Sequence, residues 1–254
     1  MTLRTIDCGD RGQIAVVSDG MELALAAASA VLGLMTNAVQ ARGVGTIALS
    51  GGSTPKTMGM LFHGEPFHSA MPWGSLQIFW GDERWVPLND PESNAGEAKR
   101  GYLDEMPVPP ANIHPWPTSG DPDNAAGIYA DTIRANVPGQ PLPIFDLILL
   151  GMGDDGHTAS LFPGTSALSI TDRITAPNPV EKLNTTRLTF TAPLINAARS
   201  VIFLAGGAGK AERLHEVLDG PLETDRLPSQ LIRPTSGELR WIVDEAAAAN
   251  LDRK

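Results

Sequence analysis

Residues 145–157 read FDLILLGMGDDGH, and this stretch decides the fold. Its apolar residues occupy consecutive positions up to Leu150, which is typical of a strand buried on both faces of a parallel sheet. The glycines that follow allow a sharp turn of the backbone. The stretch therefore predicts a central strand of an α/β protein, with two aspartates and a histidine beyond its end.

Four further apolar runs flank this strand, at residues 46–49, 76–80, 201–205 and 239–243. Helical stretches are predicted between or beyond them, at residues 18–42, 55–62, 94–105, 124–136, 209–218 and 244–251. Because strands alternate with helices, we predict an α/β fold with a mainly parallel sheet flanked by helices. The proline-containing segments 106–122 and 137–141 are predicted loops, and neither marks a domain boundary, so we expect a single domain over residues 1–254.

The first predicted helix has the clearest sequence signals. Apolar residues recur in it at spacings of three and four, at Leu23, Ala27, Ala30, Val31, Leu34 and Ala38. Ser18 or Asp19 can cap its start, and Gly43 can end it. One face of this helix is therefore expected to cover a sheet.

Composition indicates a folded protein that does not bind polyanions. The chain has 254 residues, of which 42% are hydrophobic and 19% charged. Its 19 basic and 29 acidic residues give a net charge of -10, which repels nucleic acid and acidic lipid headgroups. We therefore expect no nucleic-acid or membrane partner, and an anionic ligand would need a local cluster of donors.

Cysteine usage and the first residues bear on the compartment. Cys8 is the single cysteine, which excludes an internal disulfide and any multi-cysteine metal site. The first twelve residues lack the apolar core of a signal peptide, and no uninterrupted apolar run approaches the length of a membrane span. These features predict a soluble, cytoplasmic protein.

Residues 49–56, LSGGSTPK, leave a predicted strand and enter a helix. Gly51 and Gly52 let the backbone approach a ligand, while Ser53 and the unpaired N–H groups of the helix start can bind phosphate. An ordinary turn with a serine cap explains the same residues equally well. The spacing matches neither a Walker A loop nor GxGxxG, so no nucleotide is implied.

Residues 78–87, IFWGDERWVP, place Asp82, Glu83 and Arg84 just past another strand. Ligands bind at the carboxyl ends of parallel strands, so this cluster is expected to face the same crevice as the glycine loop. Arg84 can then bind a phosphate or carboxylate through its guanidinium. A solvated charged turn with a local ion pair is the alternative.

His157 is the strongest candidate for catalysis. Its imidazole exchanges protons near neutral pH, and Asp155, two residues away, can orient the ring. A surface or capping histidine is the simpler reading, but its place after a strand favours catalysis. A metal site is not expected, because no second histidine or cysteine accompanies it at ligand spacing.

Two further cations are candidates for an anion site. Lys210 lies in residues 203–211, FLAGGAGKA, at a predicted helix start, where the helix dipole disfavours a cation unless an anion is near. A lysine extending along the surface is the alternative. Arg187 can join the same cluster, with weaker support from the sequence.

In this order, the segments resemble the 6-phosphogluconolactonase family, within the group of sugar-phosphate isomerases and lactonases related to glucosamine-6-phosphate deaminase. The matching text is LSGGSTP at 49–55, GDERWVP at 81–87, SNAGEAKRGYLDE at 93–105, GMGDDGHTASLFPG at 151–164 and GGAGKA at 206–211. The resemblance implies a single α/β domain with a Rossmann-like parallel sheet. It also implies hydrolysis of 6-phospho-D-glucono-1,5-lactone to 6-phospho-D-gluconate in the oxidative pentose phosphate pathway, without a cofactor.

The resemblance also assigns roles to residues of this chain. His157 looks like the residue that activates water, and Asp155 lies where the deaminase relatives keep a carboxylate that assists the histidine. The loop residues Gly51, Gly52 and Ser53 look like part of the phosphate site. The cations Arg84 and Lys210 look like its partners.

Two departures separate the chain from the deaminases. Those relatives typically have tyrosine at the position of Arg84, and a glutamate that serves ring opening at the position of Phe162. Phenylalanine cannot transfer protons, so both departures favour a lactonase. The role of Asp82 stays open, since lactone hydrolysis removes no carbon-bound proton. An amino-sugar phosphate isomerase or deaminase and a non-catalytic sugar-phosphate sensor remain the alternatives.

Overall fold

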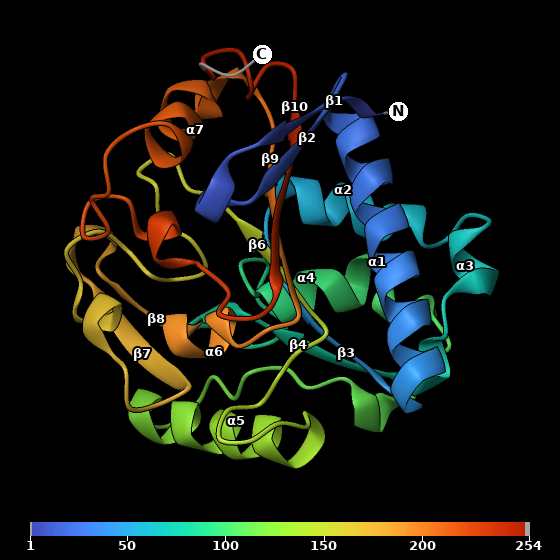
Figure 1. Ribbon diagram of the computed structural model, residues 1–254. Coiled ribbons are helices and arrows are strands. Elements are labelled where there is room, and N and C mark those ends of the chain that lie inside the picture. The colour runs from blue at the N-terminus through green and yellow to red at the C-terminus, as the bar shows by residue number, and fades with distance from the viewer. Residues whose placement is uncertain (1, 252–254) are drawn as a thin grey trace.

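Seven strands form the larger of two sheets in the computed structural model, which describes residues 2–251 (Figure 1). Their order is β1 (Thr2–Asp7), β2 (Gln13–Val17), β10 (Glu238–Asp244), β9 (Ser200–Ala205), β6 (Leu147–Gly151), β3 (Gly45–Leu49) and β4 (Leu76–Trp80). All neighbours run parallel except β1, which pairs antiparallel with β2 at one edge. The predicted parallel α/β sheet is confirmed.

The central strands are apolar on consecutive positions because both of their faces are covered. Every residue of β3 and β9 is buried, and in β6 only Gly151 is partly exposed. Ile148 pairs with Ala48 on one side and with Val201 on the other. Burial on both faces removes the alternation expected of a half-exposed strand.

Helices cover both faces of this sheet. The helices of residues 2–251 are α1 (Gly20–Arg42), α2 (Ser53–Leu61), α3 (Phe67–Ala70), α4 (Asn94–Gly101), α5 (Pro122–Asn136), α6 (Ala192–Asn196) and α7 (Ala211–Leu218). In Figure 1, α1, α2 and α3 lie on one side of the sheet, and α6 and α7 on the other. Asp19 caps α1 by accepting from the backbone N–H groups of Met21 and Glu22, and Gly43 ends it in the left-handed conformation.

Helix α1 has 23 residues and a mean hydropathy of 1.5 over an 18-residue stretch. Its length and hydropathy would suit a membrane span. Its apolar face, however, packs against the sheet, with Leu23, Ala27, Val31 and Met35 buried. A core helix of a folded domain has the same composition, so the buried face accounts for the hydropathy of α1.

A smaller antiparallel sheet stands beside the first. It consists of β5 (Asp82–Arg84), β8 (Thr185–Phe190) and β7 (Thr175–Val180), with α5 packed against β7. The chain passes from β4 to β5 at Gly81, whose N–H donates to Leu49 O at 2.9 Å and whose carbonyl accepts from Phe190 N at 2.8 Å. Gly81 therefore joins the two sheets at the carboxyl end of β4.

Several expectations from the sequence are wrong in detail. Residues 82–84, expected to lie past the end of a strand, form the strand β5, and β1, β2, β7 and β8 were not predicted. Residues 245–250 form turns rather than a helix, because the segment is too short for alanine propensity to propagate. The helix predicted over 94–105 ends at Gly101, since Tyr102 turns to φ -157° and places its ring in the core, and a 3₁₀ turn at Leu103–Glu105 follows.

Candidate active site

The strand order creates an opening at the carboxyl edge of the larger sheet. β3 and β6 are adjacent strands of this sheet. The next strand of the sheet after β3 is β4, which lies on the far side of β3, and the next one after β6 is β9, which lies on the far side of β6. The connections therefore leave the ends of β3 and β6 in opposite directions. A hollow of about 150 Å³ lies there. It is lined by Ser50, Gly51, Asp82, Arg84, Asn94, Gly151, Met152, Gly153, His157 and Ala159.

A second hollow of about 390 Å³ adjoins the first and shares Asp82, Arg84, His157 and Ala159 with it. Its other lining residues are Asp154, Asp155, Ser160, Phe162, Lys182, Leu183 and Arg187. The loops after β3 and β6 and the small sheet thus enclose one continuous site. Five of the candidate site residues from the sequence line these two hollows: Gly51, Arg84, Asp155, His157 and Arg187.

The ring of His157 is held at one nitrogen and on one face. Its Nδ1 lies 2.6 Å from Asp155 Oδ1, which also accepts from the His157 backbone N–H at 3.2 Å. Phe162 stacks on the ring, with 4.2 Å between the centroids. When Nδ1–H donates to the carboxylate, Nε2 carries the lone pair of the neutral ring and can accept a proton.

Gly153 lets the loop fold back against this histidine. A Cβ atom at residue 153 would lie 2.0 Å from His157 Nδ1. The N–H of Gly153 donates to His157 O at 2.8 Å. A glycine is therefore required where the loop approaches the imidazole.

Asp155 is kept ionised by its hydrogen-bonding partners. Partial burial acts to raise its pKa, but hydrogen bonds from His157 and Lys182 and the charge of His157 outweigh this and lower the pKa well below its usual range. Oδ1 faces His157, and Oδ2 accepts from Lys182 Nζ. The carboxylate can thus orient the ring and stabilise its protonated form.

Arg84 and Arg187 lie directly opposite each other on β5 and β8. The Nε atom of each is buried and has no hydrogen-bond partner. Burial, followed by the charge of Arg84, lowers the pKa of Arg187. Like charges directly opposite each other destabilise a sheet, and unpaired buried donors add a further penalty. A bound anion would relieve both effects.

Glu83 fixes the backbone between these groups. Its carboxylate is buried and accepts from the backbone N–H groups of Arg84, Asn94 and Ala95 at 2.7–2.8 Å, and from Ser93 Oγ at 3.1 Å. Burial raises its pKa although the backbone donors oppose this, and the neighbouring Asp82 charge adds to the rise. Glu83 therefore joins β5 to the start of α4 and has a structural role.

Asp82 is a buried residue that lines both hollows of the site. Its Oδ2 accepts from Ser160 Oγ at 2.8 Å. Ala159, the residue before Ser160, has φ 46°, in the left-handed region that non-glycine residues rarely adopt. The turn after His157 is thus held in a strained conformation next to a carboxylate.

The remaining sequence candidates lie around this site rather than all on its wall. Gly51 lines the smaller hollow, Gly52 lines a neighbouring one, and Ser53 is exposed at the start of α2. Lys210 forms an ion pair with Asp154, which lines the larger hollow. Lys210 ends a 3₁₀ turn before α7, instead of lying in the first turn of the helix as predicted.

Sequence reasoning missed Lys182 and Ser160 and treated Phe162 only as a departure from the deaminases. Lys182 lies in the 3₁₀ turn Glu181–Leu183 between β7 and β8, strands that the sequence did not reveal. No local pattern in the sequence marks Lys182.

Within residues 2–251, no group of three or more histidine, cysteine, aspartate or glutamate residues is arranged to hold a metal ion.

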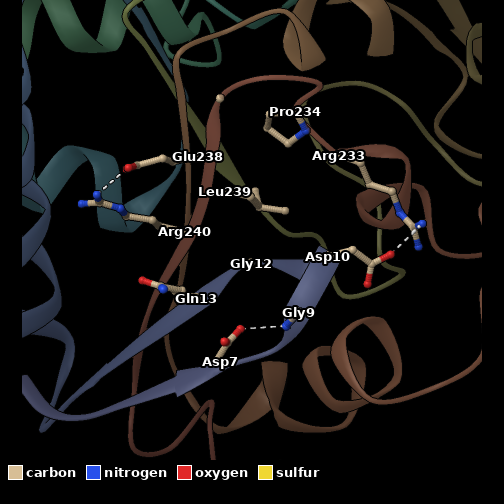
Figure 2. A pocket seen from close by; sticks show the side chains of 11 residues that line it. Asp7, Gly9, Asp10, Gly12, Gln13, Arg233, Pro234, Glu238, Leu239 and Arg240 are labelled. Carbon is tan, nitrogen blue, oxygen red and sulfur yellow. Dashed lines mark hydrogen bonds and ion pairs between the residues drawn. The ribbon is translucent and has the colours of Figure 1, made fainter.

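Figure 2 shows a different hollow, which lies at the amino ends of β2 and β10 in the larger sheet. Its volume is about 390 Å³. Its charged side chains have partners within the protein: Arg233 pairs with Asp10 at 3.0 Å, Arg240 pairs with Glu238, and Asp7 accepts from Gly9 N–H at 2.8 Å. It shares no residue with the site around His157.

Residues 18–241 match the family model described as glucosamine-6-phosphate isomerases/6-phosphogluconolactonase. The chain belongs to this family. The resemblance seen in the sequence motifs is thereby confirmed.

Alignments with individual relatives cover 85% to 94% of this chain. A protein of Synechocystis sp. named 6-phosphogluconolactonase is 47% identical over 221 residues, covering 85% of this chain and 89% of the relative. One of Nostoc sp. with the same name is 41% identical, covering 94% and 98%. The solved structure of 6-phosphogluconolactonase from Trypanosoma cruzi has a TM-score of 0.82 at 31% identity, covering 94% of this chain and 96% of that one.

Proposed function

We propose that this protein hydrolyses 6-phospho-D-glucono-1,5-lactone to 6-phospho-D-gluconate, the lactonase step of the oxidative pentose phosphate pathway. One observation carries the proposal: an aspartate-bound histidine shares a hollow with two arginines whose Nε donors lack partners. The names of the relatives, at up to 47% identity, support this choice of substrate. The proposal requires no cofactor, nucleic acid or membrane.

In the proposed mechanism, neutral His157 removes a proton from water through Nε2 while the oxygen attacks the lactone carbonyl. The carbonyl π bond opens to give a tetrahedral oxyanion. When the carbonyl re-forms, the bond to the ring oxygen breaks, and the protonated imidazole returns its proton to that oxygen, the future C5 hydroxyl. Asp155 stabilises the imidazolium between these two steps, as the carboxylate of a catalytic triad does.

The phosphate is proposed to bind at Arg84 and Arg187, whose guanidinium groups provide fixed donors for its oxygens. The loop of Gly51, Gly52 and Ser53 and the ammonium group of Lys210 are the second proposed contributors. Because Lys210 pairs with Asp154, it would have to exchange this exposed carboxylate for the phosphate. Binding of the phosphate positions the lactone carbonyl over His157.

Two observations argue against the deaminase alternative. Phe162 offers an apolar ring stacked on His157 where proton transfer to an opening sugar ring would need an acid. Arg84 lines the site with a charged hydrogen-bond donor, at the position where the deaminases typically have the phenol of a tyrosine. Asp82 remains available for such chemistry, so release of ammonia from glucosamine 6-phosphate is the discriminating assay.

The test is hydrolysis of freshly prepared lactone, followed above the spontaneous rate, with and without the 6-phosphate. We expect the phosphorylated lactone to be strongly preferred, and His157→Asn to lower kcat about 10²- to 10⁴-fold while product still binds. His63→Asn is the matched control, because His63 pairs with Glu105 and lines neither hollow of the site. Equal rates on both lactones, or full turnover by His157→Asn, would contradict the proposal.

A cytoplasmic location is part of the same proposal. The single cysteine, Cys8, cannot form an internal disulfide, as is usual for proteins of reducing compartments.

A further inference from the structure

We propose that Lys182 is a positioning residue for the reaction, which holds the Asp155–His157 pair in its working orientation from the tip of the small sheet. This inference rests on the proposed function. It begins from the place of Lys182 in the 3₁₀ turn Glu181–Leu183, which joins β7 to β8. The turn brings Lys182 to the larger hollow, beside Asp155 and Phe162.

Lys182 contacts both side chains that hold the histidine. Its Nζ donates to Asp155 Oδ2 and lies 5.1 Å from the centroid of the Phe162 ring, on which it makes a cation–π contact. Asp155 holds the imidazole at Nδ1, and Phe162 holds its face. A single ammonium group therefore supports the imidazole through two independent neighbours.

The two oxygens of Asp155 divide their partners. Oδ1 accepts from the ring and backbone N–H groups of His157, whereas Oδ2 is bound by Lys182. A carboxylate held only at Oδ1 could rotate about its Cβ–Cγ bond and turn away from the ring. With Oδ2 fixed, Oδ1 stays in line with Nδ1, so that the ring of His157, a residue lining both hollows, keeps its orientation.

A simple contribution to stability does not account for this contact. The side chain of Lys182 is half exposed, and exposed ion pairs contribute little to the free energy of unfolding. A second role also fits its place: since Lys182 lines the same hollow as Arg187, it could bind the phosphate directly. Turnover and substrate binding respond differently in the two cases, so they can be separated.

The experiment compares Lys182→Met and Lys182→Arg with Lys99→Met as the matched control. Lys99 pairs with Asp104 on the surface and lines none of the hollows described above. For Lys182→Met we expect kcat to fall about 10- to 100-fold, because a small misplacement of a catalytic group has an effect of this size. KM should change less than twofold, and the melting temperature should match that of the control. Lys182→Arg should recover most of the activity, since guanidinium groups bind carboxylates and stack on aromatic rings.

A double variant separates this inference from the proposed function. Lys182→Met added to His157→Asn should cause no further loss, because the positioning residue acts only through the histidine. A rise in KM at constant kcat would overturn positioning in favour of a phosphate contact. Unchanged kinetics of Lys182→Met, with kcat of His157→Asn lowered as expected, would overturn the role of Lys182 alone. An active His157→Asn would remove the proposed function itself.

Discussion

Replacing Arg187 with methionine should weaken binding of the phosphorylated substrate without weakening the fold. Arg187 faces Arg84 across β5 and β8, and its buried Nε has no protein partner. A hydrogen bond to a charged group contributes about 1.5–3 kcal/mol, so losing it should lower kcat/KM roughly 10- to 150-fold. Most of this change should appear as a higher KM.

The stability of the Arg187→Met variant should equal or exceed that of the wild type. Methionine retains the apolar stem of the arginine, and its introduction removes a like-charge pair across the two strands, an effect of about 0.2–1 kcal/mol. The attraction of Arg187 to the carboxylates of Asp82, Glu92 and Glu83 offsets part of this gain. The free energy of unfolding should therefore stay constant or rise by up to about 1 kcal/mol.

The assay measures hydrolysis of the phosphorylated and the plain lactone by wild type and variant, together with urea unfolding. Arg173→Met is the control, because Arg173 forms an exposed ion pair with Asp123 outside the site. The reasoning predicts that Arg187→Met loses its preference for the phosphorylated lactone. If both lactones lose activity equally, or if the variant unfolds at lower urea, Arg187 does not bind the phosphate as argued.

Three further outcomes follow from the site. His157→Ala should lower kcat about 10²- to 10⁴-fold, as expected for loss of general acid–base catalysis, and a smaller loss would point to another base. The folded pKa of Asp155 is depressed, so the ionised carboxylate stabilises the fold above its unfolded pKa of about 3.9, and this effect is lost as the pH falls. The difference in urea unfolding between wild type and Asp155→Asn should therefore be present at pH 5 and shrink steadily as the pH falls below about 4. Gly51→Ala places a Cβ atom 1.8 Å from Asn94 Oδ1, which should lower the free energy of unfolding by about 1–3 kcal/mol; an unchanged unfolding midpoint would show that the loop adjusts freely.

The main sheet could be predicted because its central strands carry a simple signal. Continuous apolar runs such as residues 147–150 occur where helices cover both faces, and the glycines after them mark the carboxyl edge. The small sheet gave no such signal. Its strand β5 consists of Asp82, Glu83 and Arg84, whose charges resemble a loop, and β7 contains Pro177 and Pro179, which normally argue against a strand.

The site was predictable to the extent that its residues follow strands of the main sheet. His157 and Asp155 come after β6, so their place at the carboxyl edge followed from the fold class. Lys182 lies 25 residues further on, in the turn of an unpredicted hairpin, and only tertiary structure brings it to Asp155. The pairing of Arg84 with Arg187 likewise depends on strand register, which local sequence does not encode.

At Gly81 the chain passes from the main sheet to the small sheet, and this arrangement bears on the size of the substrate that fits. The imidazole is carried by a loop of the main sheet, whereas the two guanidinium groups belong to the small one. If the ester reacts at the first and the phosphate binds at the second, the spacing between the sheets sets the length of sugar that fits. A change in the strands of the small sheet could then retune the enzyme to a shorter or longer sugar acid while leaving its proton-transfer groups untouched.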